Sequence, residues 1–259
     1  MNSNNKEGTK LKAIIVGGGT AIPVINHSPA SLFLQFKDFT ALLDLGPGTF
    51  SKFPMYSINP LCLNYIFISH LHPDHILDLA TYFMIRDYAN DGKENIPINL
   101  IGCNGIKQFI TQLRSLFPDI SFPSASMNIK EVASIELNIG NVQVRTTLSD
   151  HTANSISFRF SIDDKSLVYT SDCVYSKRLE KFCSKADVLI SECSFPDNWL
   201  TTDHMNAKTL GTMAENAQVK RLFVTHCYPQ ALEVNLKEQI KKYYSGCILL
   251  AQDGVRINI

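Results

Sequence analysis

The chain has 259 residues, of which 45% are hydrophobic and 19% are charged. This composition is typical of a globular protein with a substantial core and excludes a disordered chain. Lysine plus arginine and aspartate plus glutamate both number 24, so the formal net charge is zero and the basic excess of a general nucleic-acid binder is missing.

The seven cysteines include no CxxC pair, and their odd number favours reduced thiols over a disulfide framework. The first ten residues are polar and lack the apolar core of a secretion signal. No later stretch reaches the length of a membrane span. We therefore predict a cytoplasmic protein without a membrane partner, with a flexible tail over residues 1–10 and a single domain over residues 11–259.

An apolar run over residues 11–16 predicts a buried strand, followed by a tight loop at Gly17-Gly18-Gly19-Thr20. The loop is not a dinucleotide-binding fingerprint, because Ile22 stands where the third glycine belongs and Pro23 follows where a helix should run. We expect the glycines to let the backbone pass close to the active centre. His27 has no partner pattern and is predicted to be a solvated loop residue.

Residues 31–36 and 40–45 are predicted to form a hairpin. Its second strand delivers Asp44 into a Gly-Pro-Gly loop. An aspartate at a strand end can be a simple turn former, or it can hold a ligand loop in place by hydrogen bonds. We favour the second role for Asp44.

Four metal-capable side chains lie within six residues, His70-Leu71-His72-Pro73-Asp74-His75, directly after an apolar strand over residues 64–69. Because an extended backbone points alternate side chains to the same side, His70 and His72 can face one ion. Pro73 suits the first turn of a helix, from which Asp74 and His75 can face a second ion. An isolated HxH pair is common on protein surfaces, but HxHxDH at a strand-to-helix junction is far more specific.

The remaining elements follow from hydrophobic periodicity. The helix after the cluster should bury one apolar stripe, formed by Ile76, Leu79, Ala80, Phe83 and Met84, and end at a polar breaker over residues 90–93. Strands are predicted over residues 96–101, 141–148, 155–162, 166–170, 188–191, 221–225, 248–251 and 255–257. Helices are predicted over residues 106–113, 177–185, 207–217 and 232–240, and a surface loop over residues 118–126.

Three more ligand-type residues, His151, Asp172 and His226, each follow a predicted strand. The expected division is His70, His72 and His151 on one ion, Asp74, His75 and His226 on the other, and Asp172 bridging them. Neutral imidazoles then balance the carboxylates against two divalent cations, with zinc expected and manganese or iron as alternatives. Ions roughly 3.5–4 Å apart would lower the pKa of a bound water, so that a bridging hydroxide could serve hydrolysis at neutral pH.

In chain order, Asp44, the His70–His75 cluster, His151, Asp172 and His226 resemble the five motifs of the metallo-β-lactamase superfamily. The resemblance extends from Leu11 onward. It implies an α/β (α+β) fold, a four-layer αβ/βα sandwich with the ions at the edge between the two sheets. Within the superfamily, the opening Gly-Gly-Gly-Thr-Ala-Ile-Pro is similar to that of ribonuclease Z and its phosphodiesterase relatives. The segments Ser191-Glu192-Cys193-Ser194 and His204-Met205-Asn206-Ala207 are similar to theirs as well.

This resemblance implies catalytic roles for Asp74, His204 and Glu192. His204 would contact the scissile phosphate or protonate the leaving oxygen, and Glu192 would hold the imidazole in orientation. The alternative for His204 is an exposed residue at the start of a helix.

Two departures separate the chain from ribonuclease Z itself. Those enzymes resemble one another in a long glycine- and proline-rich arm between the third and fourth motifs that grips tRNA, and residues 152–171 leave no room for it here. Their fifth motif usually continues to an arginine and a tyrosine, whereas this chain has Cys227-Tyr228-Pro229, which is more like the small relatives without the arm.

The leading hypothesis is a binuclear metal-dependent phosphodiesterase acting on a small or cyclic phosphodiester. A tRNA 3′-end endoribonuclease, with an RNA 3′ end as its substrate, is the alternative, and a thioesterase or lactonase could use the same ions. A zinc β-lactamase is disfavoured, because Asp172 occupies the position where those enzymes resemble one another in a cysteine ligand. An inactive scaffold module is the non-enzyme alternative, which the complete ligand set opposes. We expect a homodimer.

Overall fold

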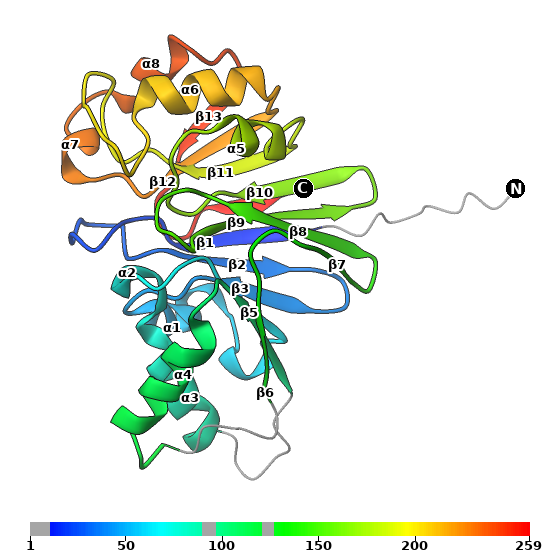
Figure 1. Cartoon of the computed structure of the whole chain (residues 1–259). Coiled ribbons are helices and arrows are strands. Elements are labelled where there is room, and N and C mark those ends of the chain that lie inside the picture. Colours follow the sequence, from blue (N-terminus) through cyan, green and yellow to red (C-terminus); the bar gives the residue numbers. More distant parts are fainter. Residues whose placement is uncertain (1–10, 90–96, 121–126) are drawn as a thin grey trace, which may run out of the picture.

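The computed structural model describes residues 11–89, 97–120 and 127–259. In these residues the chain forms two seven-stranded sheets. Helices cover the outer face of each sheet, so the layers follow the order helix, sheet, sheet, helix (Figure 1). The α/β fold class and the four-layer αβ/βα sandwich that the sequence predicted are therefore confirmed.

The first sheet is antiparallel from β14 to β3 and parallel from β3 to β6. Its strands, in spatial order, are β14 (Arg256–Asn258), β1 (Lys12–Gly17), β2 (Ser31–Gln35), β3 (Thr40–Leu43), β4 (Tyr65–Ile68), β5 (Ile98–Gly102) and β6 (Met127–Glu131). Its helical segments are α1 (Thr49–Lys52), two 3₁₀ turns (Phe53–Tyr56 and Pro60–Cys62), α2 (Pro73–Ile76), α3 (Asp78–Tyr88) and α4 (Ile106–Leu116).

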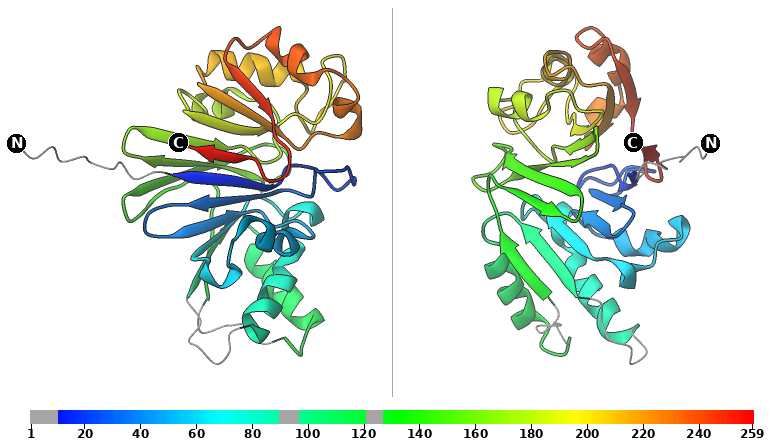
Figure 2. Two further views of the ribbon diagram at one scale, coloured as in Figure 1. Left: turned by 180° about the vertical axis from the view of Figure 1, so that it is seen from behind. Right: turned by 90° about the vertical axis from the view of Figure 1, so that its right-hand side faces the viewer.

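The second sheet repeats this plan, with antiparallel strands from β7 to β10 and parallel strands from β10 to β13. In spatial order its strands are β13 (Cys247–Leu250), β12 (Arg221–Thr225), β11 (Val188–Glu192), β10 (Lys165–Tyr169), β9 (Ile156–Ile162), β8 (Val142–Leu148) and β7 (Glu136–Ile139). Its helices are α5 (Lys177–Phe182), α6 (Ala207–Asn216), α7 (Pro229–Leu232) and α8 (Leu236–Lys241). Figure 2 shows these helices on the opposite outer side from α1–α4.

The central core lies between the two sheets. Phe67 of the first sheet meets Phe158 and Phe160 of the second edge to face, with ring centroids 5.4 and 5.2 Å apart. All three side chains are fully buried, and each such burial contributes about 1.5–3 kcal/mol. Two further apolar clusters join each sheet to its helices. The sheets are therefore fixed against each other, and so are the loops at their ends.

The C-terminal segment closes the first sheet, because β14 pairs with the free edge of β1. The turn before β14 carries Asp253, whose carboxylate accepts hydrogen bonds from the backbone N–H groups of Gly18 and Ser28. Lys52 pairs with the same carboxylate. The glycine loop after β1 is thus held by a residue from the far end of the chain.

The helix predicted after the histidine cluster is divided in two, and this corrects the predicted apolar stripe. The backbone N–H of Asp78 donates to the carbonyl of Leu45 at 3.1 Å, at the point where α2 ends and α3 begins. Within the predicted stripe Met84 is 50% exposed, and Tyr82 is fully buried in its place.

Other differences concern edges and loops. The sequence analysis does not predict β6 and β7, which are short, half-buried edge strands with only two apolar residues each. The predicted last helix divides into α7 and α8. His27 is buried instead of solvated, with 8% of its surface exposed, because its loop folds back to a bridge with Val24 and against Gly19.

Some predictions fall outside the described residues. These are the N-terminal tail over residues 1–10, the polar breaker over residues 90–93 and the part of the loop beyond residue 120. Among the described residues, no helix is long and apolar enough to cross a membrane.

Candidate metal centre

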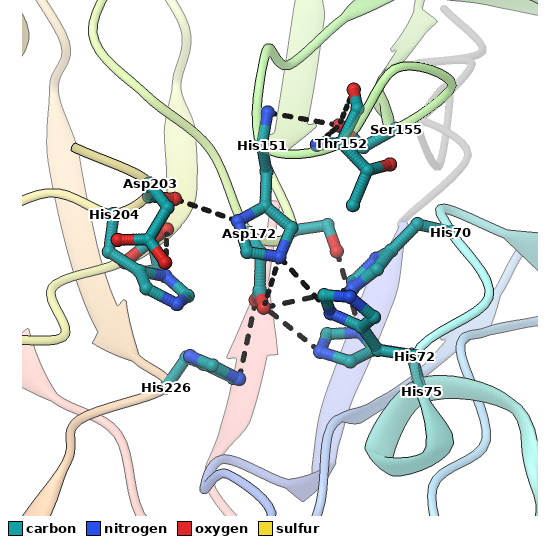
Figure 3. Close-up of polar contacts among 12 residues, drawn as sticks. His70, His72, His75, His151, Thr152, Ser155, Asp172, Asp203, His204 and His226 are labelled. Atoms are coloured by element: carbon teal, nitrogen blue, oxygen red, sulfur yellow. Dashed lines mark hydrogen bonds and ion pairs between the residues drawn. The ribbon is translucent and has the colours of Figure 1, made fainter.

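The predicted ligands gather at one edge of the sandwich, where strands of both sheets end. The first sheet supplies the His70–His75 cluster, which follows β4 and continues into α2. The second sheet supplies His151 after β8, Asp172 after β10 and His226 after β12. Figure 3 shows the imidazoles of His70, His72, His75, His151 and His226 around the carboxylate of Asp172. With Asp74, the structure brings together all seven side chains that the sequence predicted as ligands.

The backbone is unusual at the ends of β3, β10 and β12. Asp44, Ser171 and His226 have φ angles of 53°, 55° and 52°, in the left-handed region, where a non-glycine residue costs roughly 1–3 kcal/mol. Two backbone hydrogen bonds hold these turns: the N–H of Asp44 donates to the carbonyl of Phe67 at 2.8 Å, and the N–H of His226 donates to the carbonyl of Gly18 at 2.7 Å. These hydrogen bonds offset part of the backbone strain at the turns that direct the side chains of Asp44 and His226 toward the centre.

One group of ligands faces one oxygen of Asp172. Nε2 of His70 and Nε2 of His151 lie 3.8 and 3.7 Å from Oδ2 of Asp172. Nδ1 of His72 lies 3.2 Å from Nε2 of His151. This contact is short enough for a hydrogen bond and brings the two ring nitrogens next to each other. His70, His72, His151 and Asp172 form one group whose ligand atoms all lie within 4.8 Å of one another.

A second group faces the other oxygen of Asp172. Nε2 of His75 and Nε2 of His226 each lie 3.3 Å from Oδ1 of Asp172, and Nε2 of His226 also lies 3.4 Å from Oδ2 of Asp74. Asp74, His75 and His226 form a compact group by the same measure. The geometry thus reproduces the division of ligands that the sequence predicted, with Asp172 between the two groups.

The residues present fit a pair of divalent cations. Three buried atoms of the centre, Nε2 of His70, Nε2 of His75 and Oδ1 of Asp172, have no hydrogen-bond partner among the described residues. Buried polar atoms in native proteins are nearly always hydrogen-bonded, so the presence of such atoms in both groups indicates that each group binds a ligand. Imidazole nitrogen and carboxylate oxygen are donors that zinc and similar cations prefer.

The ligand imidazoles are oriented through their other ring nitrogen. Nδ1 of His70 lies 2.9 Å from Oγ of Ser69. Nδ1 of His75 lies 2.8 Å from Oδ2 of Asp44, and Nδ1 of His151 lies 2.7 Å from the carbonyl oxygen of Asp203. For His75 and His151 the partner is an acceptor, so Nδ1 carries the proton and Nε2 keeps its lone pair for a cation.

Asp44 confirms its predicted role. It is fully buried and accepts hydrogen bonds from the backbone N–H and the hydroxyl of Ser69, at 2.8 and 2.7 Å, besides its contact with His75. It also accepts from the hydroxyls of Tyr169 at 2.9 Å and Ser171 at 3.2 Å. Because Tyr169 and Ser171 belong to the β10 side, Asp44 joins the two sheets as well as the ligand loop.

The electrostatics of the centre reflect its burial and its close carboxylates. Burial lowers the pKa of His70 well below its ordinary value, so this imidazole is neutral, as a ligand must be. Burial acts in the same direction on His75, but Asp172 and Asp44 outweigh it and raise the pKa of His75 well above the ordinary value. Burial opposes ionisation of Asp172, but His226 and His75 hold its pKa well below the usual range. Cation binding is therefore expected to release the proton of His75.

His204 and Glu192 form a pair at the border of this centre. Nδ1 of His204 lies 2.9 Å from Oε1 of Glu192, and His204 forms a third compact group with Asp172 and His226. Burial would lower the pKa of His204, but the hydrogen bond and charge of Glu192 raise it to about 9. His204 is 9% exposed, so the alternative of an exposed residue at a helix start is wrong.

The sequence analysis misses several residues that support the centre. Ser69, Ser171 and Tyr169 complete the hydrogen bonds of Asp44. Ser194 donates to Oε2 of Glu192 at 2.5 Å and lies 3.4 Å from Nδ1 of His226. Their common signal is a hydroxyl at or within two residues of the end of a strand that leads into the site, namely β4, β10 or β11. Tyr228, whose ring centroid lies 5.8 Å from that of His226, is missed as well.

Comparisons with known proteins agree with this geometry. A family model described as "Anti-Pycsar protein Apyc1" matches residues 11–245. The chain is 24% identical over 249 residues to the "Probable metallo-hydrolase YhfI" of Bacillus subtilis, covering 94% of this chain and 98% of that protein. It is 22% identical over 280 residues to ribonuclease Z of Thermoplasma volcanium, covering 88% of this chain and 90% of that protein.

Solved structures share the fold. The crystal structure of the metallo-β-lactamase fold protein YhfI from Bacillus subtilis matches with a TM-score of 0.84 at 23% identity, over 96% of this chain and all of that one. Human tRNase Z, short form, matches with a TM-score of 0.78 at 20% identity, over 95% and 98% of the two chains. The chain thus has the metallo-β-lactamase fold predicted from its sequence and is related to metallo-hydrolases and ribonuclease Z.

Proposed function

The chain belongs to the family described as Anti-Pycsar protein Apyc1, and from this premise we propose that it is a binuclear metal-dependent phosphodiesterase acting on a small or cyclic phosphodiester. Its relatives among metallo-hydrolases support a hydrolase. The choice of a phosphodiester depends on the centre itself.

One observation carries the proposal, which is that Asp172 faces the two ligand groups with different oxygens. Oδ2 lies near His70 and His151, and Oδ1 lies near His75 and His226. A carboxylate so placed can be shared by two cations. When bound, a pair of divalent cations would supply Lewis acidity to both the entering and the leaving oxygen of an in-line displacement, which is the demand of phosphodiester hydrolysis.

His204 supports the same reaction from the other side of the site. Its Nδ1 is engaged by Glu192, whose hydrogen bond and charge favour the protonated imidazole, so Nε2 is available. It can therefore donate a proton to the leaving oxygen. Glu192 also accepts from the backbone N–H of Cys173 at 2.7 Å and of Met205 at 3.3 Å, so backbone contacts keep the carboxylate in place.

The direct test uses bis-p-nitrophenyl phosphate. The purified protein, loaded with zinc or manganese, is expected to release nitrophenol, and His204→Ala is expected to lower kcat by about 100- to 10,000-fold. The metal content should stay at two equivalents in this variant. Asp38→Asn, in the exposed turn between β2 and β3, is the matched control and should keep the wild-type rate.

Three results would change the proposal. Absence of nitrophenol release by the metal-loaded wild type would contradict the proposed phosphodiesterase activity. Undiminished activity in His204→Ala would contradict the role of His204 as proton donor. Loss of one metal equivalent in His204→Ala would make His204 a ligand, because it also groups with Asp172 and His226.

The alternative is cleavage of tRNA precursors at the 3′ end, which the similarity to ribonuclease Z motivates. The interval between His151 and Asp172 is filled by β9, a two-residue turn and β10, so no arm projects from this interval. A small substrate is favoured for that reason. Site-specific cleavage of a tRNA precursor at a higher kcat/KM than small diesters would favour the alternative.

A further inference from the structure

The outer face of the second sheet changes character along the sheet. On β10 and β11 this face is apolar, because Val168 and Leu189 pack against the helices. On β8 the side chain of Val144 points into the core between the sheets, so the alternation of a strand directs its neighbour Arg145 to the outer face. The outer face of β8 therefore presents a charged group where the rest of the sheet presents apolar ones.

Two arginines lie opposite each other on this face. Arg145 of β8 is paired in register with Arg159 of β9, an arrangement in which like charges repel. Nη1 of Arg159 donates to the carbonyl oxygens of Phe182 and Ser184, at 2.9 Å each, and Nη2 donates to Oγ of Ser166 at 3.1 Å. Burial lowers the pKa of Arg159, and the charge of Arg145 lowers it further. The chain thus supplies acceptors for one guanidinium of the pair.

Arg145 has no comparable acceptors. It is half-buried, and its Nε is fully buried without a hydrogen-bond partner among the described residues. Glu136 of β7 lies opposite Arg145 in register, but its carboxylate accepts from Nε2 of Gln143 at 2.8 Å. A buried donor of a charged group that lacks an acceptor costs free energy, so an acceptor from outside the chain would stabilise Arg145.

A pocket of about 390 Å³ provides the room for such an acceptor. It is lined by Arg145 together with Arg178 and Lys181 of α5, which are three residues apart and so share one face of the helix. We call it the Arg145 pocket. Arg178 pairs with Asp150, whereas Lys181 is exposed. Glu136 is the one acidic residue among the described residues that line this pocket, so positive charge prevails in it.

An adjoining pocket shows the opposite arrangement. It measures about 550 Å³ and is lined by Arg159, Lys165, Lys220 and Asp187 among others. Nζ of Lys220 and Nζ of Lys165 lie 2.8 and 3.9 Å from Oδ1 of Asp187, whose side chain is buried. The chain therefore neutralises the cations of this pocket with a carboxylate of its own, which it does not do for Arg145.

We propose that the Arg145 pocket binds the phosphoryl group of a small phosphomonoester. A guanidinium presents paired N–H donors that match two phosphate oxygens, and Lys181 adds a second positive charge to balance a dianion. Free phosphate has the same chemistry, but the volume of the pocket leaves room for the carbon skeleton of an ester. The lining residues include none of the predicted metal ligands, so this inference does not depend on the proposed function.

The test is calorimetric titration of the metal-loaded protein at constant ionic strength, because salt screens exposed charges. The probes are glycerol 3-phosphate, inorganic phosphate and acetate. Glycerol 3-phosphate is expected to bind most tightly, and acetate about 10-fold or more weakly, because it carries a single charge. Both phosphates can also bind the metal centre, so each titration is repeated on the metal-free protein, where binding at the Arg145 pocket should persist.

Variants locate the binding event. Arg145→Gln should weaken the binding of glycerol 3-phosphate by about 10-fold or more, since it removes the charged donors. Lys181→Gln changes an exposed side chain that the fold does not need, and it should weaken binding by about 3-fold or more. Glu136→Gln should strengthen binding, because it removes the competing carboxylate. Lys208→Gln, an exposed lysine of α6 outside the pocket, is the matched control and should bind as wild type does.

Four results would overturn the inference or its details. Equal affinity in wild type, Arg145→Gln and Lys181→Gln would show that the phosphoryl group binds elsewhere, and binding that disappears with the metal would place it at the metal centre. Absence of binding by both phosphates would overturn the site. Tighter binding of inorganic phosphate than of glycerol 3-phosphate would overturn the choice of an ester. These titrations do not measure hydrolysis, so failure of the proposed phosphodiesterase leaves their interpretation unchanged.

Discussion

The two sheets contribute to the metal centre in different ways. The first sheet supplies four metal-capable side chains from one stretch, His70–His75, that spans a strand end and one helical turn. The second sheet supplies single residues that follow three different strands, namely His151, Asp172 and His226. A local backbone segment is enough to arrange the first set, whereas the second set meets only when β8, β10 and β12 are in register. The comparison teaches that the shared carboxylate, Asp172, belongs to the half of the site that depends on tertiary folding.

The largest expected effect comes from removing the shared carboxylate. Asp172→Asn keeps the shape of the side chain but removes the charge between His75 and His226. We expect it to weaken the binding of both cations by more than about 100-fold, because loss of even an indirect partner of a metal ligand costs 10- to 100-fold. Metal content after dialysis, with Asp38→Asn as control, is the measurement. Retention of two equivalents would show that the sheets bind their cations independently.

A smaller effect is expected from replacing Asp44, the hydrogen-bond partner of His75. Asp44→Asn removes the carboxylate that accepts from Nδ1 of His75, and we expect about a 10- to 100-fold loss of affinity for one cation. The cation held by His70, His72 and His151 should be affected less. Calorimetric titration of the metal-free protein with zinc separates the two events, and an equal loss in both would contradict an effect localised at His75.

The contact between the sheets can be weakened without touching a ligand. Tyr169→Phe removes one hydroxyl that donates to the buried carboxylate of Asp44, and a hydrogen bond to a charged group contributes about 2 kcal/mol. We expect the free energy of unfolding to fall by about this amount in urea. Tyr175→Phe, which removes a half-buried hydroxyl bonded to Glu180, is the control and should cost less. Equal losses in the two variants would indicate that the Asp44 contact has no special importance.

The smallest effect concerns pH. The pKa of His204 is raised to about 9 by Glu192 against the opposing effect of burial, from an ordinary value near 6.5. The stabilisation from this pair is therefore fully present below about pH 6.5 and is lost as the pH rises through about 9. Because both groups are buried, the cost of removing their charges from water offsets most of their attraction, and we expect a net stabilisation of about 1 kcal/mol.

The metal-free protein is the right sample for this measurement. The difference in unfolding free energy between wild type and His204→Gln should shrink by about 1 kcal/mol between about pH 6 and pH 10. A difference that stays constant over this range would mean that the proton on His204 is not held by Glu192.

The sequence predicts the fold and the convergence of the candidate ligands well, for a reason that lies in the strand ends. Each ligand follows an apolar run, and apolar runs locate strands even when their bounds shift by a residue or two. His151 is an example, because its strand was placed within one residue of β8 although its partners lie far away in the sequence.

What the sequence does not predict depends on tertiary contacts. The break between α2 and α3 coincides with a hydrogen bond of Asp78 to Leu45, which no periodicity encodes. The burial of His27 depends on the return of its loop against Gly19. The role of Tyr169 requires knowing that β10 ends opposite β3 in the other sheet. The local sequence around these residues does not indicate their roles, because each role depends on a contact with a distant segment of the chain.

The pairing of β14 with β1 has a consequence for biosynthesis. While the chain emerges from the ribosome, β1 has an open edge until β14 has been made, and an open edge can pair with other nascent chains. The glycine loop, whose carbonyl at Gly18 receives the N–H of His226, lacks its anchor Asp253 for the same period. We therefore expect the centre to mature only after the turn at Asp253 has left the ribosome, because this turn holds the loop on which His226 rests.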